Sequence, residues 1–208
     1  YPEAMKNHQA SLKIREAAGD REGIAVSYYY IGSVNTMQGN YSEALKYETE
    51  GLKIREEIGY KEHIYLVYNI IGSVKYRQGN YPEALKYFGI AQKIHEETGY
   101  KQGLSVLLNN IGILYRTQGN YPEALKNYFI ALKKAQEIGE KRYEAGAYSR
   151  IGSIYAAQSN YSESLKYFFI ALKIFEETGQ KPSIAATYYN IGDICNKMGN
   201  TPEAMKNL

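Results

Sequence analysis

The chain has 208 residues, of which 44% are hydrophobic and 23% are charged, a composition typical of folded globular proteins. The net charge is only +3 and both signs are interspersed, which argues against a nucleic-acid-binding surface. The single cysteine excludes an intrachain disulfide, and neither a membrane span nor a signal peptide is visible, so we expect a cytoplasmic protein without nucleic-acid or membrane partners.

Helices are predicted along the whole chain, in antiparallel pairs. The first is a lone helix over residues 1–18. Helix pairs follow at about 21–58, 61–98, 101–138, 141–178 and 181–208. We predict an all-α chain forming a single tandem-repeat domain over residues 1–208. Neither end carries a polar capping helix, so we expect a piece of a longer array.

Two glycine positions recur every 40 residues and define the repeat. One ends the second helix of each unit, at 19, 59, 99, 139 and 179. The other lies inside the first helix, at 32, 72, 112, 152 and 192. A glycine inside a helix is unfavourable by about 1 kcal/mol relative to alanine. We therefore predict that the paired helices approach closely at these glycines, with alanines such as Ala84 and Ala124 marking the facing helix.

The second helix of each unit begins with a capping pattern. Asn120 is predicted as the N-cap, with Pro122 in the first turn and Glu123 three residues after the cap. The same asparagine and glutamate spacing recurs from Asn80, Asn160 and Asn200. The first full repeat differs further along this helix, because Glu48 and Gly51 replace the aromatic residue and the alanine, and the pattern leaves its packing open.

These residues resemble the tetratricopeptide repeat family. The matching positions in the third pair are Leu108, Ile111, Gly112, Tyr115, Ala124, Tyr128 and Ala131. The period is 40 residues instead of about 34, Tyr or Leu replaces Trp, and the closing proline is absent. The chain is thus similar to the long-repeat subclass found in signalling scaffolds and in sensor modules of bacterial regulators. The resemblance implies a right-handed superhelical solenoid of antiparallel helix pairs.

The resemblance also implies that the first helix of each pair lines a concave binding groove. We predict that the side chains opposite its core face bind a peptide: Asn69, Ser73, Tyr76, Arg77, Asn109, Asn110, Arg116, Arg150, Tyr189, Asn190 and Lys197. Asparagine can bond both polar groups of an extended backbone, and arginine can hold a carboxylate bidentately. Alternatively, some of these residues only solvate the groove or bond each other, and its tyrosines belong to the core.

Catalytic patterns are not found. The chain has no P-loop, no cysteine pair and no HExxH motif. His8, His63 and His95 share no repeat phase and are predicted to be solvated, whereas Cys195 is predicted to be a small buried apolar group. We expect no catalytic residue, no metal ion and no cofactor.

The sequence therefore favours a non-catalytic scaffold that binds a protein or peptide segment, acidic or extended. Self-association through the uncapped repeat ends is a further expectation. The alternative is a peptide-responsive sensor domain of a bacterial signalling or transcription regulator whose output domain lies outside this chain. The two hypotheses separate on ligand size, because the second binds a short signalling peptide in the groove.

Overall fold

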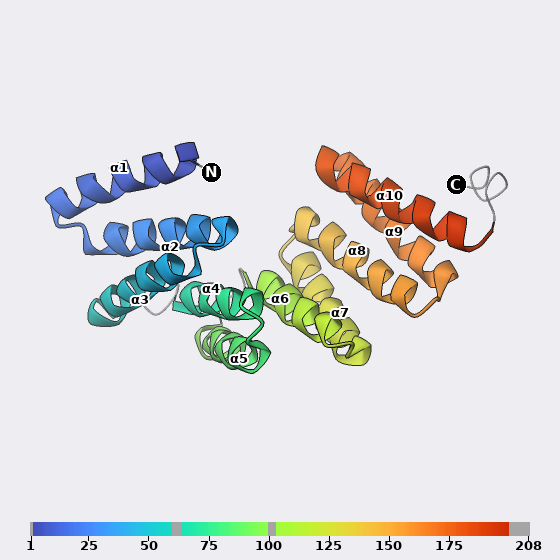
Figure 1. Ribbon diagram of the computed structural model, residues 1–208, viewed down its shortest axis with the longest axis horizontal. Coiled ribbons are helices and arrows are strands. Elements are labelled where there is room, and N and C mark those ends of the chain that lie inside the picture. The colour runs from blue at the N-terminus through green and yellow to red at the C-terminus, as the bar shows by residue number, and fades with distance from the viewer. Residues whose placement is uncertain (1, 60–63, 100–102, 200–208) are drawn as a thin grey trace. The chain divides into compact units, whose positions relative to one another are not determined.

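The computed structural model describes residues 2–59, 64–99 and 103–199, and these residues fold into helices joined by short turns (Figure 1). The helices are α1 (Pro2–Ala18), α2 (Arg21–Gln38), α3 (Tyr41–Glu57), α4 (Ile64–Arg77), α5 (Tyr81–Thr98), α6 (Leu104–Thr117), α7 (Tyr121–Glu137), α8 (Lys141–Ala157), α9 (Tyr161–Glu177) and α10 (Lys181–Lys197). The predicted all-α fold is confirmed.

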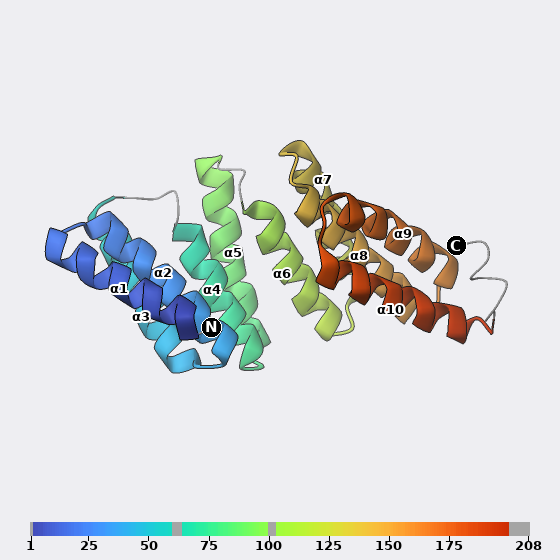
Figure 2. The ribbon, with the colours of Figure 1, turned by 90° about the horizontal axis from the view of Figure 1, so that it is seen from above.

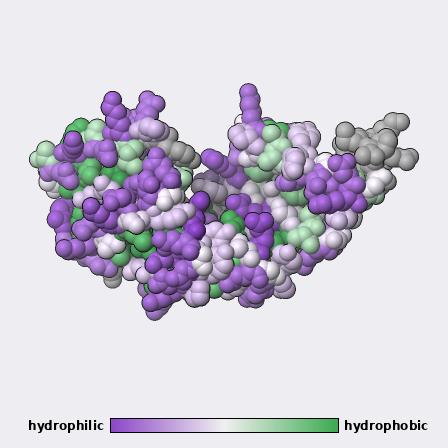
Figure 3. Space-filling model, in the orientation of Figure 1, coloured by the Kyte–Doolittle hydropathy of each residue, from purple (hydrophilic) through white to green (hydrophobic). Residues whose placement is uncertain are grey.

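The chain forms two compact units, Tyr1–Gly103 and Leu104–Leu208. Inside each unit, consecutive helices run antiparallel and pack side by side, as both ribbon views show (Figures 1 and 2). Hydrophilic side chains cover most of the face seen in Figure 3, with small hydrophobic areas between them. Within the described residues, no helix is long and apolar enough to cross a membrane.

The helix ends follow the predicted caps. The side-chain oxygen of Asn120 accepts a hydrogen bond of 3.3 Å from the backbone N–H of Glu123, and Asn80 and Asn160 act in the same way. Asn40 makes no such bond, and Asn200 lies outside the described residues. These bonds satisfy backbone donors that the first turn of a helix leaves without partners.

The helix glycines Gly32, Gly72, Gly112 and Gly152 pack against the paired helix, as predicted, whereas a Cβ atom at Gly192 would meet nothing within 4 Å among the described residues. A Cβ atom added at Gly72 would lie 2.6 Å from ring atoms of Phe88, too close for two carbon atoms. The aromatic ring is thus the closest neighbour here, and at Gly152 the small residue predicted on the facing helix is also in contact, since the Ser164 hydroxyl donates a hydrogen bond of 2.7 Å to the Gly152 carbonyl. Ala204, the equivalent residue expected near Gly192, lies outside the described residues.

In the helix pair α2 and α3, Glu48 occupies the position that Phe88 has in the pair α4 and α5. Its side chain lies against Gly32 and is fully buried. Neither carboxylate oxygen has a hydrogen-bond partner in the described part of the chain. This pair therefore packs with a buried acid in the position that an aromatic ring fills in the other repeats.

The prediction that the histidines are solvated is wrong for His95. This residue is buried, and its ring centroid lies 3.9 Å from that of Tyr65 in α4. The aromatic partner comes from the neighbouring helix, so the repeat phase of His95 alone could not reveal it. His8 is half-buried and stacks on Tyr30, whereas His63 lies outside the described residues.

The core of the second unit determines which face of α8 and of α10 is buried and which face is turned away from the core. Ile151 and Ile154 of α8 pack with Tyr128 of α7. Ile191 of α10 packs with Phe168 of α9, beside the buried thiol of Cys195, which confirms the apolar role predicted for that cysteine. The opposite side of α8 is consequently turned away from this core.

Candidate functional site

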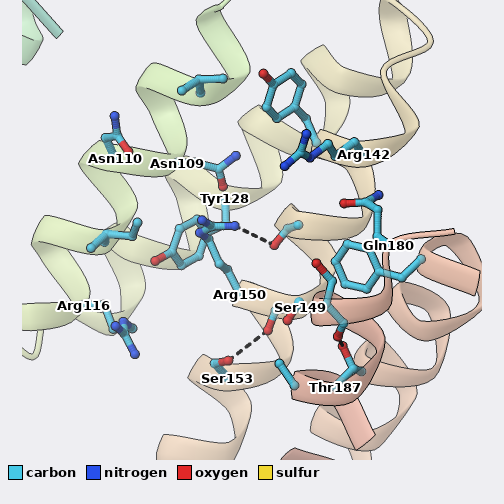
Figure 4. Close-up of a pocket in the computed structure, with 17 residues that line it drawn as sticks. Asn109, Asn110, Arg116, Tyr128, Arg142, Ser149, Arg150, Ser153, Gln180 and Thr187 are labelled. Carbon is cyan, nitrogen blue, oxygen red and sulfur yellow. Dashed lines mark hydrogen bonds between the residues drawn. The ribbon is translucent and has the colours of Figure 1, made fainter. Parts of the chain in front are cut away.

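A pocket of about 570 Å³ lies in the second unit, on the side of α8 that is turned away from the core (Figure 4). This volume is within the range of roughly 300–1,000 Å³ that small-ligand sites occupy. Its walls come mainly from α6, α8 and α10, with one side chain each from α7 and α9. The polar and aromatic residues that line it are Asn109, Asn110, Arg116, Tyr128, Arg142, Tyr143, Ser149, Arg150, Ser153, Phe175, Gln180, Ser183 and Thr187.

Helical periodicity explains which residues reach the pocket. On α8, Arg142, Ser149 and Ser153 follow one another at spacings of seven and four residues, which places them on one face of a helix. Asn109, Ile113 and Arg116 form the equivalent stripe on α6, at spacings of four and three. The sequence of each helix thus separates its pocket face from its core face.

Arg150 extends across the middle of the pocket (Figure 4). Its Nη1 donates a hydrogen bond of 3.1 Å to the backbone carbonyl of Gly146, one turn earlier in α8. Burial lowers the pKa of the Arg150 guanidinium, the neighbouring Tyr128 raises it, and the positive charge of Arg116 lowers it again. Arginine remains charged in proteins despite such shifts, so the pocket holds a partly desolvated cation.

The charge of the pocket is entirely positive. Arg116, Arg142 and Arg150 line it, and there is no aspartate or glutamate among its described lining residues. None of the ion pairs observed between described residues involves any of these three arginines. The pocket therefore attracts anionic groups.

The hydroxyl groups in the walls are partly engaged by their own helices. Ser153 donates to the carbonyl of Ser149 at 2.9 Å, and Thr187 donates to the carbonyl of Ser183 at 2.7 Å (Figure 4). Each hydroxyl oxygen keeps acceptor capacity after donating its proton. In contrast, the amide oxygen of the buried Asn109 has no hydrogen-bond partner within the described ranges.

The pocket brings together four of the residues predicted from the sequence: Asn109, Asn110, Arg116 and Arg150. The predicted residues of α10 lie outside its wall. Tyr189 is 76% exposed, Asn190 is half-buried, and Lys197 forms an ion pair of 2.7 Å with Asp193. The predicted residues of the second unit thus fall into two groups, one that lines the pocket and one on α10 outside it.

The other predicted residues belong to α4 in the first unit. Ser73 donates a hydrogen bond of 2.8 Å to the carbonyl of Asn69, so these two residues bond each other. The ring of Tyr76 lies 5.8 Å from that of Tyr81, measured between centroids, whereas Arg77 is exposed at the end of α4. Their role in peptide binding stays a prediction.

Several lining residues were missed, above all Arg142, Tyr143, Gln180 and Ser183. They lie in or just before the first turns of α8 and α10, whereas the sequence prediction considered only the middle of each first helix. Arg142 could have been found from its helical spacing to Ser149 and Ser153, which places all three on one face of the helix. Among the residues that the structure describes, no group of His, Cys, Asp or Glu is arranged to hold a metal ion.

Comparison with known proteins gives one family match and a set of similar folds. The family model described as "Tetratricopeptide repeat" matches residues 1–57, 64–138 and 143–208. Comparison with curated proteins finds no match.

Among solved structures, BtubC (BKLC) from P. vanneervenii is 18% identical, with a TM-score of 0.83 over 99% of this chain and 87% of that one. A Rap protein complexed with Competence and Sporulation Factor is 18% identical, with a TM-score of 0.64 over 94% of this chain and 59% of that one. A signal transduction ATPase with a tetratricopeptide repeat sensor, from Pyrococcus horikoshii, is 23% identical, with a TM-score of 0.69 over 88% of this chain and 28% of that one. At these identities the similarity shows a shared fold alone.

Proposed function

The chain belongs to the tetratricopeptide repeat family, and from this premise we propose that it is a non-catalytic module that binds a protein or peptide segment on the first helices of its repeats. One observation carries the proposal: the pocket between α6, α8 and α10 is lined by three arginines and by no acidic residue among those described. A ligand with negative charge complements it. Family membership supports protein binding in general, and the positive charge of the pocket supports this location.

The composition of the pocket favours binding over catalysis. Its candidate nucleophiles are the hydroxyls of Ser149, Ser153, Ser183 and Thr187, and such a hydroxyl needs a neighbouring base to become reactive. There is no His, Asp, Glu, Lys or Cys among the described lining residues that could act as that base. The side chains that remain are hydrogen-bond donors, acceptors and fixed cations, which are groups that orient a ligand.

We propose an acidic or extended segment as the partner, in the cytoplasm. Arginine forms paired hydrogen bonds with carboxylates, and this favours acidic side chains over neutral ones. Asn110, on the same helix as Arg116, is suited to bond an extended backbone, because its amide both donates and accepts. In the unit Tyr1–Gly103, we propose a separate set of peptide-binding residues on α4, namely Asn69, Ser73, Tyr76 and Arg77.

Peptide-array and pull-down binding tests this assignment. Arg150→Ala and Asn110→Ala are expected to weaken partner binding, because each removes a polar group that lines the pocket. Lys133→Ala is the matched control, since Lys133 is exposed on α7 and does not line the pocket. If both pocket variants, still folded, retain every partner bound by the wild-type chain, the assignment of binding to this face is wrong.

The second candidate is a peptide-responsive sensor domain of a bacterial signalling or transcription regulator. Two proteins of similar fold favour it, one complexed with Competence and Sporulation Factor and one with a tetratricopeptide repeat sensor. A sensor must change its conformational equilibrium when the ligand binds. Hydrogen exchange with and without a bound peptide separates the two candidates, because a scaffold is protected only at the contact whereas a sensor changes at distant helices.

Self-association through the terminal repeats is also part of the proposal. Ile14 of α1 is 71% exposed and Tyr188 of α10 is 55% exposed, so each of these helices presents a large apolar side chain to solvent. Size-exclusion chromatography over a range of concentrations tests this point. A monomer at every concentration would contradict self-association and would leave the binding proposal unaffected.

A further inference from the structure

We infer that the first unit carries a separate docking site, at which a cationic side chain of a basic protein segment lies against two tyrosine rings and beside two exposed carboxylates. This tyrosine–glutamate site consists of Tyr28 of α2, Tyr47 and Glu50 of α3, and Glu16 of α1. It lies within the unit Tyr1–Gly103 and does not depend on the pocket of the second unit. Its ligand has the opposite charge to the ligand proposed for that pocket.

Two tyrosine rings form the centre of the site. The ring centroids of Tyr28 and Tyr47 lie 5.6 Å apart, and the ring planes are tilted by 52°. Both residues are half-buried, so part of each side chain is exposed to solvent. The face of a tyrosine ring attracts a cation that lies within about 6 Å of its centroid. Because each ring already packs against the other, a ligand binds them without having to order them first.

Two carboxylates lie beside the rings. Glu50 follows Tyr47 by one turn of α3, so both lie on the same face of that helix. Burial raises the pKa of Tyr28, and the nearby negative charges of Glu16 and Glu50 raise it further. Both glutamates are exposed, and none of the ion pairs observed between described residues involves either of them. These carboxylates are therefore available to pair with a cation of a partner.

The corresponding ring in the second unit already has a cation on its face. Tyr167 of α9 takes the repeat position of Tyr47, and the Nζ of Lys166 lies 5.7 Å from the centroid of its ring. Lys46 precedes Tyr47 in the same way, but its side chain is exposed and makes no such contact within the described ranges. Tyr47 therefore has a ring face suited to a cation that the described residues do not supply.

The carboxylates distinguish this site from its counterpart in the second unit. Tyr148 and Tyr167 form the corresponding pair of rings, with centroids 6.2 Å apart. The neutral residues Gln136 and Ile170 take the repeat positions of the two glutamates. This second pair of tyrosines therefore serves as an internal control, since it offers the rings without the negative charge.

The next repeat carries a related group, which favours an extended ligand. The rings of Tyr68 and Tyr87 stack with centroids 6.2 Å apart. Burial raises the pKa of Tyr68, and the negative charge of the exposed Glu56 raises it further. A chain that carries several cations can use both groups of the first unit. A basic protein segment does so, and family membership supports protein binding in general.

Short peptides titrated into the full chain and followed by NMR chemical shifts test the inference. Acetyl-Gly-Arg-Gly-Arg-Gly-amide carries two guanidinium groups, and the peptide with glutamine in place of both arginines is its neutral match. A third peptide, with lysine at both places, carries two ammonium groups. Putrescine carries two ammonium groups without a peptide backbone.

The arginine peptide is expected to bind about five-fold or more tightly than the glutamine peptide, because only the cation gains from the rings and the carboxylates. Its binding should shift the ring signals of Tyr28 and Tyr47. The ring signals of Tyr148 and Tyr167 should change little, because that pair lacks the carboxylates. Equal binding of the lysine peptide supports the inference and shows that charge is recognised, not the guanidinium plane.

Three substitutions test the assigned residues. Glu16→Gln, Glu50→Gln and Tyr47→Leu should each weaken the arginine peptide by about two- to five-fold and leave the glutamine peptide unchanged. Glu3→Gln is the matched control, since it removes the same exposed charge from the first turn of α1, whereas Glu16 lies in the last turns of that helix. Circular dichroism checks that each variant is folded.

Equal affinity for the arginine and glutamine peptides would overturn the inference, as would the absence of binding by every probe. If putrescine binds as tightly as the arginine peptide, the protein segment is the wrong partner. Unchanged affinity of all three variants for the arginine peptide contradicts the assigned residues. If Tyr47→Leu does not fold, the exposed Glu16 and Glu50 decide, and unchanged affinity of both glutamine variants contradicts the inference.

Discussion

Glu48 is an acidic residue in a position that aromatic residues fill in the later repeats. Its position in α3 corresponds to that of Phe88, Tyr128 and Phe168, and it is equally buried. Burial raises the pKa of the Glu48 carboxyl well above its ordinary value, and the nearby Arg55 lowers it by a smaller amount. The folded chain therefore keeps Glu48 protonated at pH values where the unfolded chain has already ionised it.

This difference predicts how stability depends on pH. Above the ordinary glutamate pKa of 4.5, the folded state holds a proton that the unfolded state has lost, so the free energy of unfolding falls as the pH rises. Glu48→Gln should remove this part of the slope, because its amide does not titrate. Urea unfolding from pH 4.5 to 8 measures it, with the exposed Glu50→Gln as the matched control. Equal slopes in the wild type and in Glu48→Gln would contradict the prediction.

The recurrent helix glycines make a second prediction at the residue scale. A Cβ atom at Gly112 would lie 2.7 Å from a ring carbon of Tyr128, so Gly112→Ala should destabilise the chain by about 1–3 kcal/mol. Gly89 is a matched control inside α5, since a Cβ atom there meets nothing within 4 Å. Gly89→Ala should stabilise by up to about 1 kcal/mol. Chemical denaturation measures both, and effects of the same sign would refute the contact explanation.

At the scale of the elements, the turn before α9 differs from its counterparts. Ser159 has φ of 59° and is the only described non-glycine residue with positive φ, whereas Gly39, Gly79 and Gly119 fill this place in other turns. The left-handed conformation is unfavourable for residues with a Cβ atom. Ser159→Gly should therefore raise the free energy of unfolding by about 0.5–1 kcal/mol. A lower thermal midpoint for Ser159→Gly than for the wild type would count against this strain.

The helices themselves could be predicted from the sequence because their signals are local. Asn120 and Gly139 mark the ends of α7, and the structure shows both the side-chain cap and a positive φ of 73° at the glycine. The family match confirms the tetratricopeptide resemblance. The burial of His95 was missed, because it depends on a ring of a neighbouring helix, which no repeat phase reveals.

The candidate site could be predicted only in part, because its walls, like the burial of His95, depend on contacts between helices. Helical phase was enough to select Asn110 and Arg150, which share the pocket face of their helices. It was not enough to select Gln180 and Ser183, since these residues line the pocket only because of where α10 lies in the unit. A wall made by three helices is a property of their packing, and the sequence specifies that packing only indirectly.

At the scale of the whole molecule, the net charge of +3 says little about the ligand, because the informative charges are local. The pocket lies entirely within the unit Leu104–Leu208, so its chemistry can be tested without reference to the other unit. Arg150 is partly shielded from water, whereas Arg116 and Arg142 are exposed, so salt screens the charge of Arg150 less than theirs.

The most direct test of peptide binding on the first helices is NMR chemical-shift mapping of the full chain with a peptide selected from an array. The largest changes are expected on the pocket faces of α6, α8 and α10, at residues such as Asn110, Arg150 and Ser183. Lys133 on α7 and Lys173 on α9 are exposed and lie outside the pocket wall, and should change little. Changes confined to α7 and α9 would contradict the proposed binding face.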